Sequence, residues 1–279
     1  MIIHELWSPD DDARADACLR AVEEHDLAEA LLSVEGAPAE VARRVKSQLS
    51  GWGRALAGRL GSQPSPPQVQ ARALAGYLGD ELGFRGDVDD YYHAQNSRLS
   101  EVISRRRGLP ILLSAVWMEV GAIAGIQVEG VGMPGHFIAR VGGAGGQLID
   151  PFGGGRLLSV DDCQRIVREM SQGNVPWRDD HLATTEPKQM LERVLANLVQ
   201  AYGRTNETIS LYRTLTLLAR VRPDVPSYCL KRAAAAEALG ARGQAAQIYA
   251  DIIRRYPGSQ EASLAQQRHD AARAKHAWN

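Results

Sequence analysis

The sequence predicts an α+β fold followed by an all-α region, and three observations carry this prediction. An apolar stretch that begins at Pro110 has the composition of a buried helix. Two runs rich in β-branched residues, 137–141 and 147–150, flank a glycine-rich segment, as in an antiparallel hairpin. From about residue 188 to the end, the chain is typical of successive helices.

The central helix, over residues 111–124, is predicted by its start, its composition and its end. Pro110 has no amide hydrogen and a fixed φ, so it suits the first turn of a helix, and Gly108 lets the chain turn before it. The stretch is apolar on most of its circumference, which is typical of a core helix. Its 14 residues are too few to cross a bilayer, and Gly125 ends it as a left-handed cap.

The hairpin places a histidine and an aspartate near each other. His136 and Asp150 are 14 positions apart, at the start of one predicted strand and the end of the next. Pairing across the hairpin can bring the imidazole and the carboxylate into contact, the arrangement in which a carboxylate orients a catalytic histidine. The alternative is structural: His136 is then a buried strand residue and Asp150 a turn residue before Pro151.

Three motifs in this part of the chain resemble a known family. N-S-x-L-x-x-V-x-x-R-R-R-G-x-P ends at Pro110, G-x-P-G-H-F contains His136, and I-D-P-F-x-G-G contains Asp150. In type and order they resemble the SirB1 family, a bacterial transglutaminase-like group often followed by tetratricopeptide-like helices. The resemblance implies a papain-like transglutaminase-type core, with helices packed on a small antiparallel sheet. It also implies that His136 and Asp150 match the second and third members of the catalytic triad.

The sequence departs from this pattern at the nucleophile. Counted back from Gly125, the position of the transglutaminase cysteine falls at or near Pro110, in a Gly-x-Pro where active members carry Gly-x-Cys. Papain-like acyl transfer requires a thiolate, which proline cannot supply. Ser114 lies one helical turn later and is the substitute nucleophile to consider. A displacement of about 5 Å is large for catalytic geometry, and a helical serine usually bonds the carbonyl one turn back.

The spacing of the cysteines and the absence of cofactor motifs predict neither a metal site nor a bound cofactor. Cys18, Cys163 and Cys229 are widely spaced without metal-ligand partners, so we expect buried, reduced thiols and no metal site. Cys163 falls in the first turn of a helix opened by Ser159, where two adjacent carboxylates oppose a lowered thiol pKa. The sequence has no phosphate-binding loop, no G-x-G-x-x-G after a strand and no H-E-x-x-H, so no cofactor is expected.

The net charge and the first residues of the chain limit the classes of partner and the compartment that we expect. With 32 basic and 33 acidic residues the net charge is −1, which gives no field favouring nucleic acid or membrane. The basic triplet 105–107 ends a predicted helix and suits the helix dipole better than a phosphate. The first residues resemble neither a signal nor a transit peptide, which leads us to expect a cytoplasmic protein.

The 279 residues are predicted to form two domains, 1–180 and 188–279. Before residue 90 we expect helices over 10–30, 39–60 and 69–82. Beyond the polar segment 174–187, the expected helices are 190–202, 207–219, 225–239, 243–255 and 259–275. Pro223 and Pro257 are 34 residues apart, the tetratricopeptide period; a plain helical bundle is the alternative.

Two functions remain open on this basis. The first is a non-catalytic module that binds a protein or peptide, favoured by the missing nucleophile and the predicted repeats, which present a concave surface. The second is an amide hydrolase or transferase in which His136 and Asp150 activate water or a hydroxyl such as Ser114. In both, the residues expected to line the cleft are Asn96, Gly108, Pro110, Pro134 and Gly135.

Overall fold

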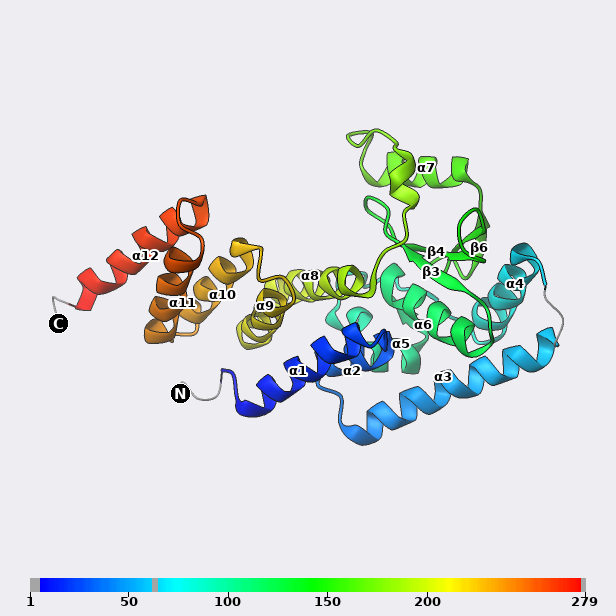
Figure 1. Cartoon of the computed structure of the whole chain (residues 1–279), viewed down its shortest axis with the longest axis horizontal. Helices are drawn as coiled ribbons and strands as arrows, with labels where there is room; N and C mark the ends of the chain where they lie inside the picture. The colour runs from blue at the N-terminus through cyan, green and yellow to red at the C-terminus, as the bar shows by residue number, and fades with distance from the viewer. Residues whose placement is uncertain (1–5, 62–64, 277–279) are drawn as a thin grey trace. The chain divides into compact units, whose positions relative to one another are not determined.

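The computed structural model describes residues 6–61 and 65–276, and their contacts form two units (Figure 1). The core unit is Arg20–Val194; the helical unit combines the residues up to Leu19 with those from Leu195 onward. Helices α1 (Pro9–Glu23) and α8 (Pro187–Thr205) each contribute to both units. Division into domains at 1–180 and 188–279 stays a prediction.

The predicted α+β class is confirmed, and the core unit contains a four-stranded antiparallel sheet in the order β3-β4-β5-β6. The predicted hairpin is β4–β5, in which Ala139 lies opposite Ile149. Sequence analysis missed β6, which is only three residues long and follows a run of glycines. The strands are β3 (Val128–Val131), β4 (Ile138–Val141), β5 (Gln147–Asp150) and β6 (Arg156–Leu158).

Helices cover both faces of this sheet (Figure 1). Because side chains alternate along a strand, Ile138 and Leu148 point to one face and Ala139 and Ile149 to the other. The first face packs on α7 (Val160–Met170). The second lies toward α6 (Pro110–Ile123) and α4 (Pro67–Leu74). The sheet is therefore covered on both sides, with Arg156 of the edge strand β6 exposed.

The central helix is confirmed within one residue of its predicted bounds. Pro110 is its first residue, nearly every side chain of α6 is buried, and Gly125 follows the helix with φ of 74°. Trp117 is fully buried and meets Phe84 edge-to-face at 5.9 Å between ring centroids. This helix is the centre of the core unit, as its uniform apolarity predicts.

The predicted helix over residues 10–30 is wrong, because the chain breaks there into α1 and α2. His25 takes the left-handed conformation, with φ of 60°. Asp26 then caps the next helix by accepting a hydrogen bond from the amide of Glu29 at 2.8 Å. The remaining helices of this part are α2 (Leu27–Glu35), α3 (Ala39–Leu60), α4 and α5 (Leu99–Arg105).

The predicted helix over residues 69–82 changes type halfway. After α4, residues Ala75–Glu81 form a π-helical segment, which ends with the amide of Leu82 bonded to the carbonyl of Tyr77 at 2.9 Å. Gly79 in this segment packs directly on the backbone of Gly154: a Cβ at Gly79 would lie 1.9 Å from the carbonyl oxygen of Gly154. Only glycine allows this approach, which fixes the loop that follows Asp150.

The C-terminal region is all-helical, as predicted. Its helices after α8 are α9 (Thr208–Val221), α10 (Pro226–Ala238), α11 (Arg242–Arg255) and α12 (Gln260–His276), and consecutive helices contact each other. Leu6 is buried in the same hydrophobic cluster as Tyr212 and Tyr249. The start of the chain therefore contributes to the helical unit. That the C-terminal helices form tetratricopeptide-like repeats stays a prediction.

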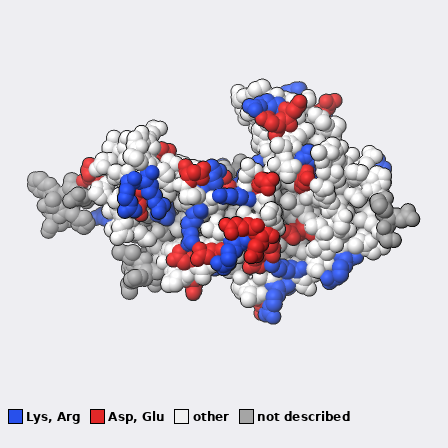
Figure 2. Space-filling model, in the orientation of Figure 1, with Lys and Arg blue, Asp and Glu red and all other residues white. Residues whose placement is uncertain are grey.

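Surface charge and hydropathy agree with an ordinary globular chain. On the face drawn in Figure 2, basic and acidic side chains are interspersed. Among the helices of residues 6–61 and 65–276, we find none that combines the length and apolarity needed to cross a bilayer. The first five residues, on which the expectation about targeting partly rests, lie outside the described ranges.

Glu35 gives the core unit a predictable pH dependence. Its carboxylate accepts hydrogen bonds from the amide and hydroxyl of Ser100, at 3.1 and 2.9 Å. Burial nevertheless raises the pKa of Glu35 to about 7, because desolvation outweighs these bonds and nearby Arg98, while Glu101 adds repulsion. The folded state therefore holds a proton that the unfolded chain releases near its ordinary carboxyl pKa.

We expect the free energy of unfolding to fall by about 2 kcal/mol between pH 5 and pH 8 as this carboxyl ionises. A raised carboxyl pKa means that stability is present at low pH and is lost as the pH passes 7. Glu35→Gln should flatten the profile, whereas Glu40→Gln, at an exposed position, should not. Urea unfolding across this pH range measures both. Parallel profiles for wild type and Glu35→Gln would contradict this assignment.

Candidate active site

His136 and Asp150 are in contact in the core unit. Nε2 of His136 lies 3.0 Å from Oδ1 of Asp150, and the two side chains are 10% and 9% exposed. His136 follows the turn at Gly135 immediately before β4, and Asp150 ends β5, so antiparallel pairing brings them together. The contact predicted from their spacing is present; their catalytic role stays a prediction.

The backbone after Asp150 holds its carboxylate in place. Oδ1 of Asp150 also accepts a hydrogen bond from the amide of Phe152 at 3.1 Å, and the amide of Gly155 donates to the Asp150 carbonyl at 2.8 Å. Oδ1 therefore serves the loop and the imidazole together. A carboxylate fixed in this way sets the orientation of His136, as an acid–base pair requires.

An aromatic side chain packs against the imidazole. Phe152 meets His136 edge-to-face at 5.9 Å, and Tyr91 contacts the same phenyl ring at 5.9 Å. The ring of Phe152 lies over Gly86, where a Cβ would come within 2.3 Å of it. Sequence reasoning did not assign this role to Phe152, although the residue stands in the I-D-P-F motif.

Pro110 and Ser114, the two positions considered for a nucleophile, are both buried in α6. Pro110 is buried at the start of α6, where the pattern of the family would place the thiol. Ser114 is fully buried, and its hydroxyl has no hydrogen-bond partner within the described ranges. It therefore bonds neither His136 nor the carbonyl one turn back.

Cys163, the cysteine considered in this part of the chain, is buried with a free thiol. It lies in the first turn of α7, whose cap is Ser159 in a reciprocal pair with Asp162. Burial, together with the carboxylates of Asp162 and Asp150, raises the pKa of the Cys163 thiol to about 11. The thiol is therefore protonated at neutral pH and packs with the sheet side chains. Cys18 is also buried, and burial raises its pKa to about 12.

Asn96 and Gly108, expected at the cleft, are buried and structural. The side-chain amide of Asn96 donates to the carbonyl of Asp90 at 2.7 Å, and Arg105 donates to its oxygen at 2.9 Å. Arg105 also pairs with Asp87 at 2.5 Å. Gly108 pairs with Gly86 in the short parallel ladder of β1 (Arg85–Gly86) and β2 (Arg107–Gly108). The basic triplet thus makes structural contacts.

Pro134 and Gly135, by contrast, line an open groove of about 540 Å³. Arg193 of α8 enters this groove and donates to the carbonyls of Met133 and His136, at 3.3 and 3.4 Å. It therefore holds the backbone that carries His136. The sequence gives no signal for this contact, because Arg193 lies beyond the predicted domain boundary at 174–187. The full lining is Gly132, Met133, Pro134, Gly135, Arg178, Asp180, His181 and Arg193.

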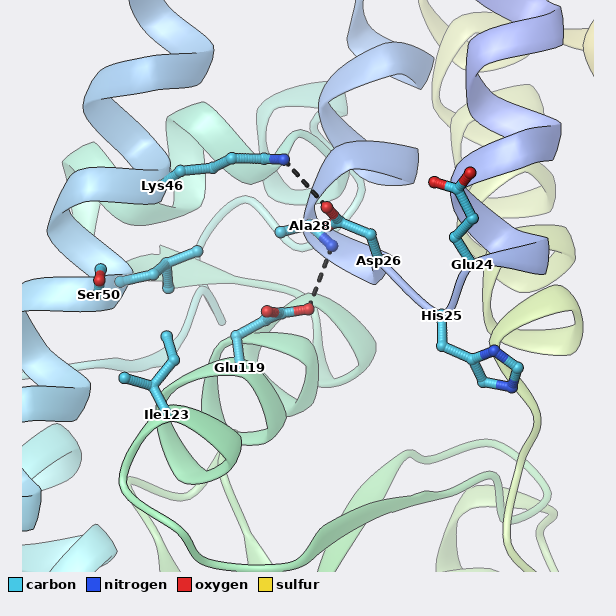
Figure 3. A pocket seen from close by; sticks show the side chains of 9 residues that line it. Glu24, His25, Asp26, Ala28, Lys46, Ser50, Glu119 and Ile123 are labelled. Carbon is cyan, nitrogen blue, oxygen red and sulfur yellow. Dashed lines mark hydrogen bonds and ion pairs between the residues drawn. The ribbon is translucent and has the colours of Figure 1, made fainter.

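A second pocket, of about 420 Å³, lies between α2, α3 and α6 (Figure 3). Lys46 pairs with Asp26 and Glu29 at 3.0 and 2.8 Å. Glu119 accepts a hydrogen bond from the amide of Ala28 at 3.1 Å and so caps α2, while burial raises the pKa of its carboxyl. Because Lys46 and Glu119 already satisfy neighbouring groups, we interpret this pocket as a structural junction of three helices.

Comparison with known proteins agrees with this geometry. A family model described as the transglutaminase-like superfamily matches residues 34–196. Two UPF0162 proteins from strains of Xylella fastidiosa are 33% and 32% identical over 202 residues, which cover 70% of this chain and 71% of each relative. Human F-box only protein 21 is 29% identical over 153 residues, 48% of this chain but 23% of that protein. No solved structure matches significantly. The chain therefore belongs to the transglutaminase-like superfamily and is a member of the UPF0162 family.

Proposed function

We propose that this protein is a pseudoenzyme of the transglutaminase-like superfamily that binds a protein or peptide partner in its core groove and on its helical repeats. One observation carries the proposal: Pro110 begins the central helix, and no thiolate accompanies His136 and Asp150 within the described residues. Without a nucleophile the imidazole has no thiol to activate. The pair then serves to fix the loops around the groove.

The groove supports a binding role. Gly135 is exposed with φ of 76°, and Pro134 beside it presents a rigid turn without an amide donor. The groove around these residues is open to solvent. We further infer membership of the SirB1 family, a tetratricopeptide-like region over residues 188–279, and a cytoplasmic protein without nucleic-acid or membrane partners.

An amide hydrolase or transferase is the second candidate. The observation that favours it is the intact contact of His136 with Asp150, which orients an imidazole as a general base requires. The nucleophile would then be water in a hydrolase, or the acceptor amine in a transferase, rather than a side chain, because Ser114 is buried.

An activity assay separates the two functions. Wild type and His136→Ala are compared in hydrolysis of fluorogenic peptide amides and in incorporation of a fluorescent amine into casein. We expect neither protein to exceed the buffer rate. Turnover by wild type that falls at least 100-fold in His136→Ala, with unchanged circular dichroism, would establish the hydrolase or transferase instead.

Binding at the groove is tested by photocrosslinking. A benzophenone amino acid replaces Arg178, an exposed residue that lines the groove, or Val88, an exposed residue elsewhere on the core unit. We expect adducts with a cytoplasmic extract from position 178 only, and excess unlabelled wild type should suppress them. Adducts of equal yield from both positions, or adducts that resist competition, would contradict a partner in the groove.

A further inference from the structure

The helical unit contains a pocket of its own, which the proposed function leaves unassigned. It encloses about 430 Å³ between the start of the chain and helices α9, α10 and α11. Its lining combines two arginines with amides, hydroxyls and carboxylates. The lining residues are Trp7, Asp12, Tyr212, Thr216, Arg220, Arg232, Gln244, Gln247, Ile248 and Asp251.

Most charges of this pocket are already paired. Arg220 bridges two carboxylates of α1, with Asp12 at 2.7 Å and Asp16 as the second partner. Asp12 also accepts a hydrogen bond from the indole of Trp7 at 2.9 Å. Asp251 pairs with Arg254, one turn along α11, at 2.5 Å. These pairs leave one charged side chain of the lining to account for.

Arg232 of α10 is that side chain. Across the part of the chain that the structure describes, it forms no ion pair, and its Nε atom is buried without a hydrogen-bond partner. A buried donor on a charged group that lacks a partner is destabilising, and a bound ligand that accepts its hydrogen bond removes that cost. The guanidinium therefore carries an unused positive charge inside the pocket.

Gln244 of α11 provides an unused acceptor in the same pocket. Its Nε2 donates to the hydroxyl of Tyr212 at 2.6 Å, which fixes the amide, while its Oε1 is buried without a partner within the described ranges. The pocket thus presents one cationic donor and one neutral acceptor. A ligand that satisfies both has a negatively charged oxygen and an N–H group.

We propose that this pocket binds a carboxylate of a peptide, with the guanidinium of Arg232 on the carboxylate and Oε1 of Gln244 accepting an N–H of the same peptide. This inference rests on the proposed binding function and names the chemistry of the partner. A single uncompensated cation matches a monoanion. A phosphate, with charge of about −1.5 to −2, would leave excess negative charge beside a single unpaired cation. Trp7 and Ile248 provide apolar walls for the adjoining side chain.

The carboxylate has two possible sources, which three labelled peptide pools distinguish. The probes are a fluorescein-labelled random heptapeptide pool with free C-termini, the same pool amidated, and a pool without Asp and Glu. Fluorescence polarisation with the full chain measures binding. A C-terminal source predicts at least tenfold weaker binding of the amidated pool, and a side-chain source predicts the same loss for the pool without Asp and Glu. Equal binding of all three pools, or binding of none, overturns the inference.

Variants locate the binding in the pocket. Arg232→Gln should weaken binding at least tenfold, while Lys231→Gln, an exposed change on the same helix, should leave it unchanged. Gln244→Glu replaces the neutral acceptor by a carboxylate in the pocket that Arg232 also lines; it should abolish binding without lowering the melting temperature. Unchanged binding by both pocket variants overturns the inference, as does loss of binding in Gln244→Glu that accompanies unfolding.

This experiment is independent of the groove in the core unit. Adducts from position 178 together with no peptide binding would remove only the inference about Arg232. Peptide binding lost in Arg232→Gln, without adducts from position 178, would support the helical pocket and remove the groove from the proposed function. Failure of both measurements would reject the binding function itself.

Discussion

Replacing Gly79 by alanine is expected to destabilise the core unit by about 3 kcal/mol. The added Cβ would lie 1.9 Å from the carbonyl oxygen of Gly154 and 2.8 Å from its carbon. These are backbone atoms, so no side-chain rotation relieves the overlap. The loop 151–155 or the π-helical segment must move, and the loop carries the amides that hold Asp150.

Gly76 provides the matched control for this prediction. It stands in the same π-helical segment, and a Cβ there meets nothing within 4 Å. Gly76→Ala should be neutral or stabilise by up to about 1 kcal/mol, since alanine restricts the unfolded chain. Urea unfolding, with hydrogen exchange by mass spectrometry on peptides from 75–86, measures both variants. Equal effects of the two substitutions would show that the contact with Gly154 is unimportant.

Truncating Phe84 to alanine is expected to cost about 3–5 kcal/mol of unfolding free energy. Phe84 is fully buried between two tryptophans, with ring centroids 5.4 Å from Trp52 and 5.9 Å from Trp117, both edge-to-face. Its removal opens a cavity between α3 and α6 that these large rings cannot fill. It also releases the anchor of β1, the strand that carries Gly86 beneath Phe152.

Val88→Ala is the control, because Val88 is 72% exposed four residues later. Its effect should stay within about 0.5 kcal/mol. Tryptophan fluorescence during urea unfolding reports the transition, and near-ultraviolet circular dichroism reports the aromatic packing. A loss below about 1 kcal/mol for Phe84→Ala would mean that the aromatic cluster collapses into the space or contributes little.

The local features of this protein are determined by its sequence. Pro110 and Gly125 delimit the central helix because each acts on its own backbone, through a fixed φ and a left-handed cap. The glycine-rich segment between the runs 137–141 and 147–150 indicates the hairpin. With the hairpin given, the spacing of His136 and Asp150 is enough to predict their contact. Each of these inferences needs only neighbours in the chain or one short turn.

Other features were decided by the tertiary structure alone. Sequence neighbours give no signal for three of these features. They are the break at His25, the π-helical segment beneath Gly154, and the bonds from Arg193 to the backbone around His136. The burial of Ser114 and the unpaired guanidinium of Arg232 are of the same kind. Whether a polar group is satisfied depends on the atoms around it, most of them distant in sequence. Packing therefore decides which side chains are left for binding.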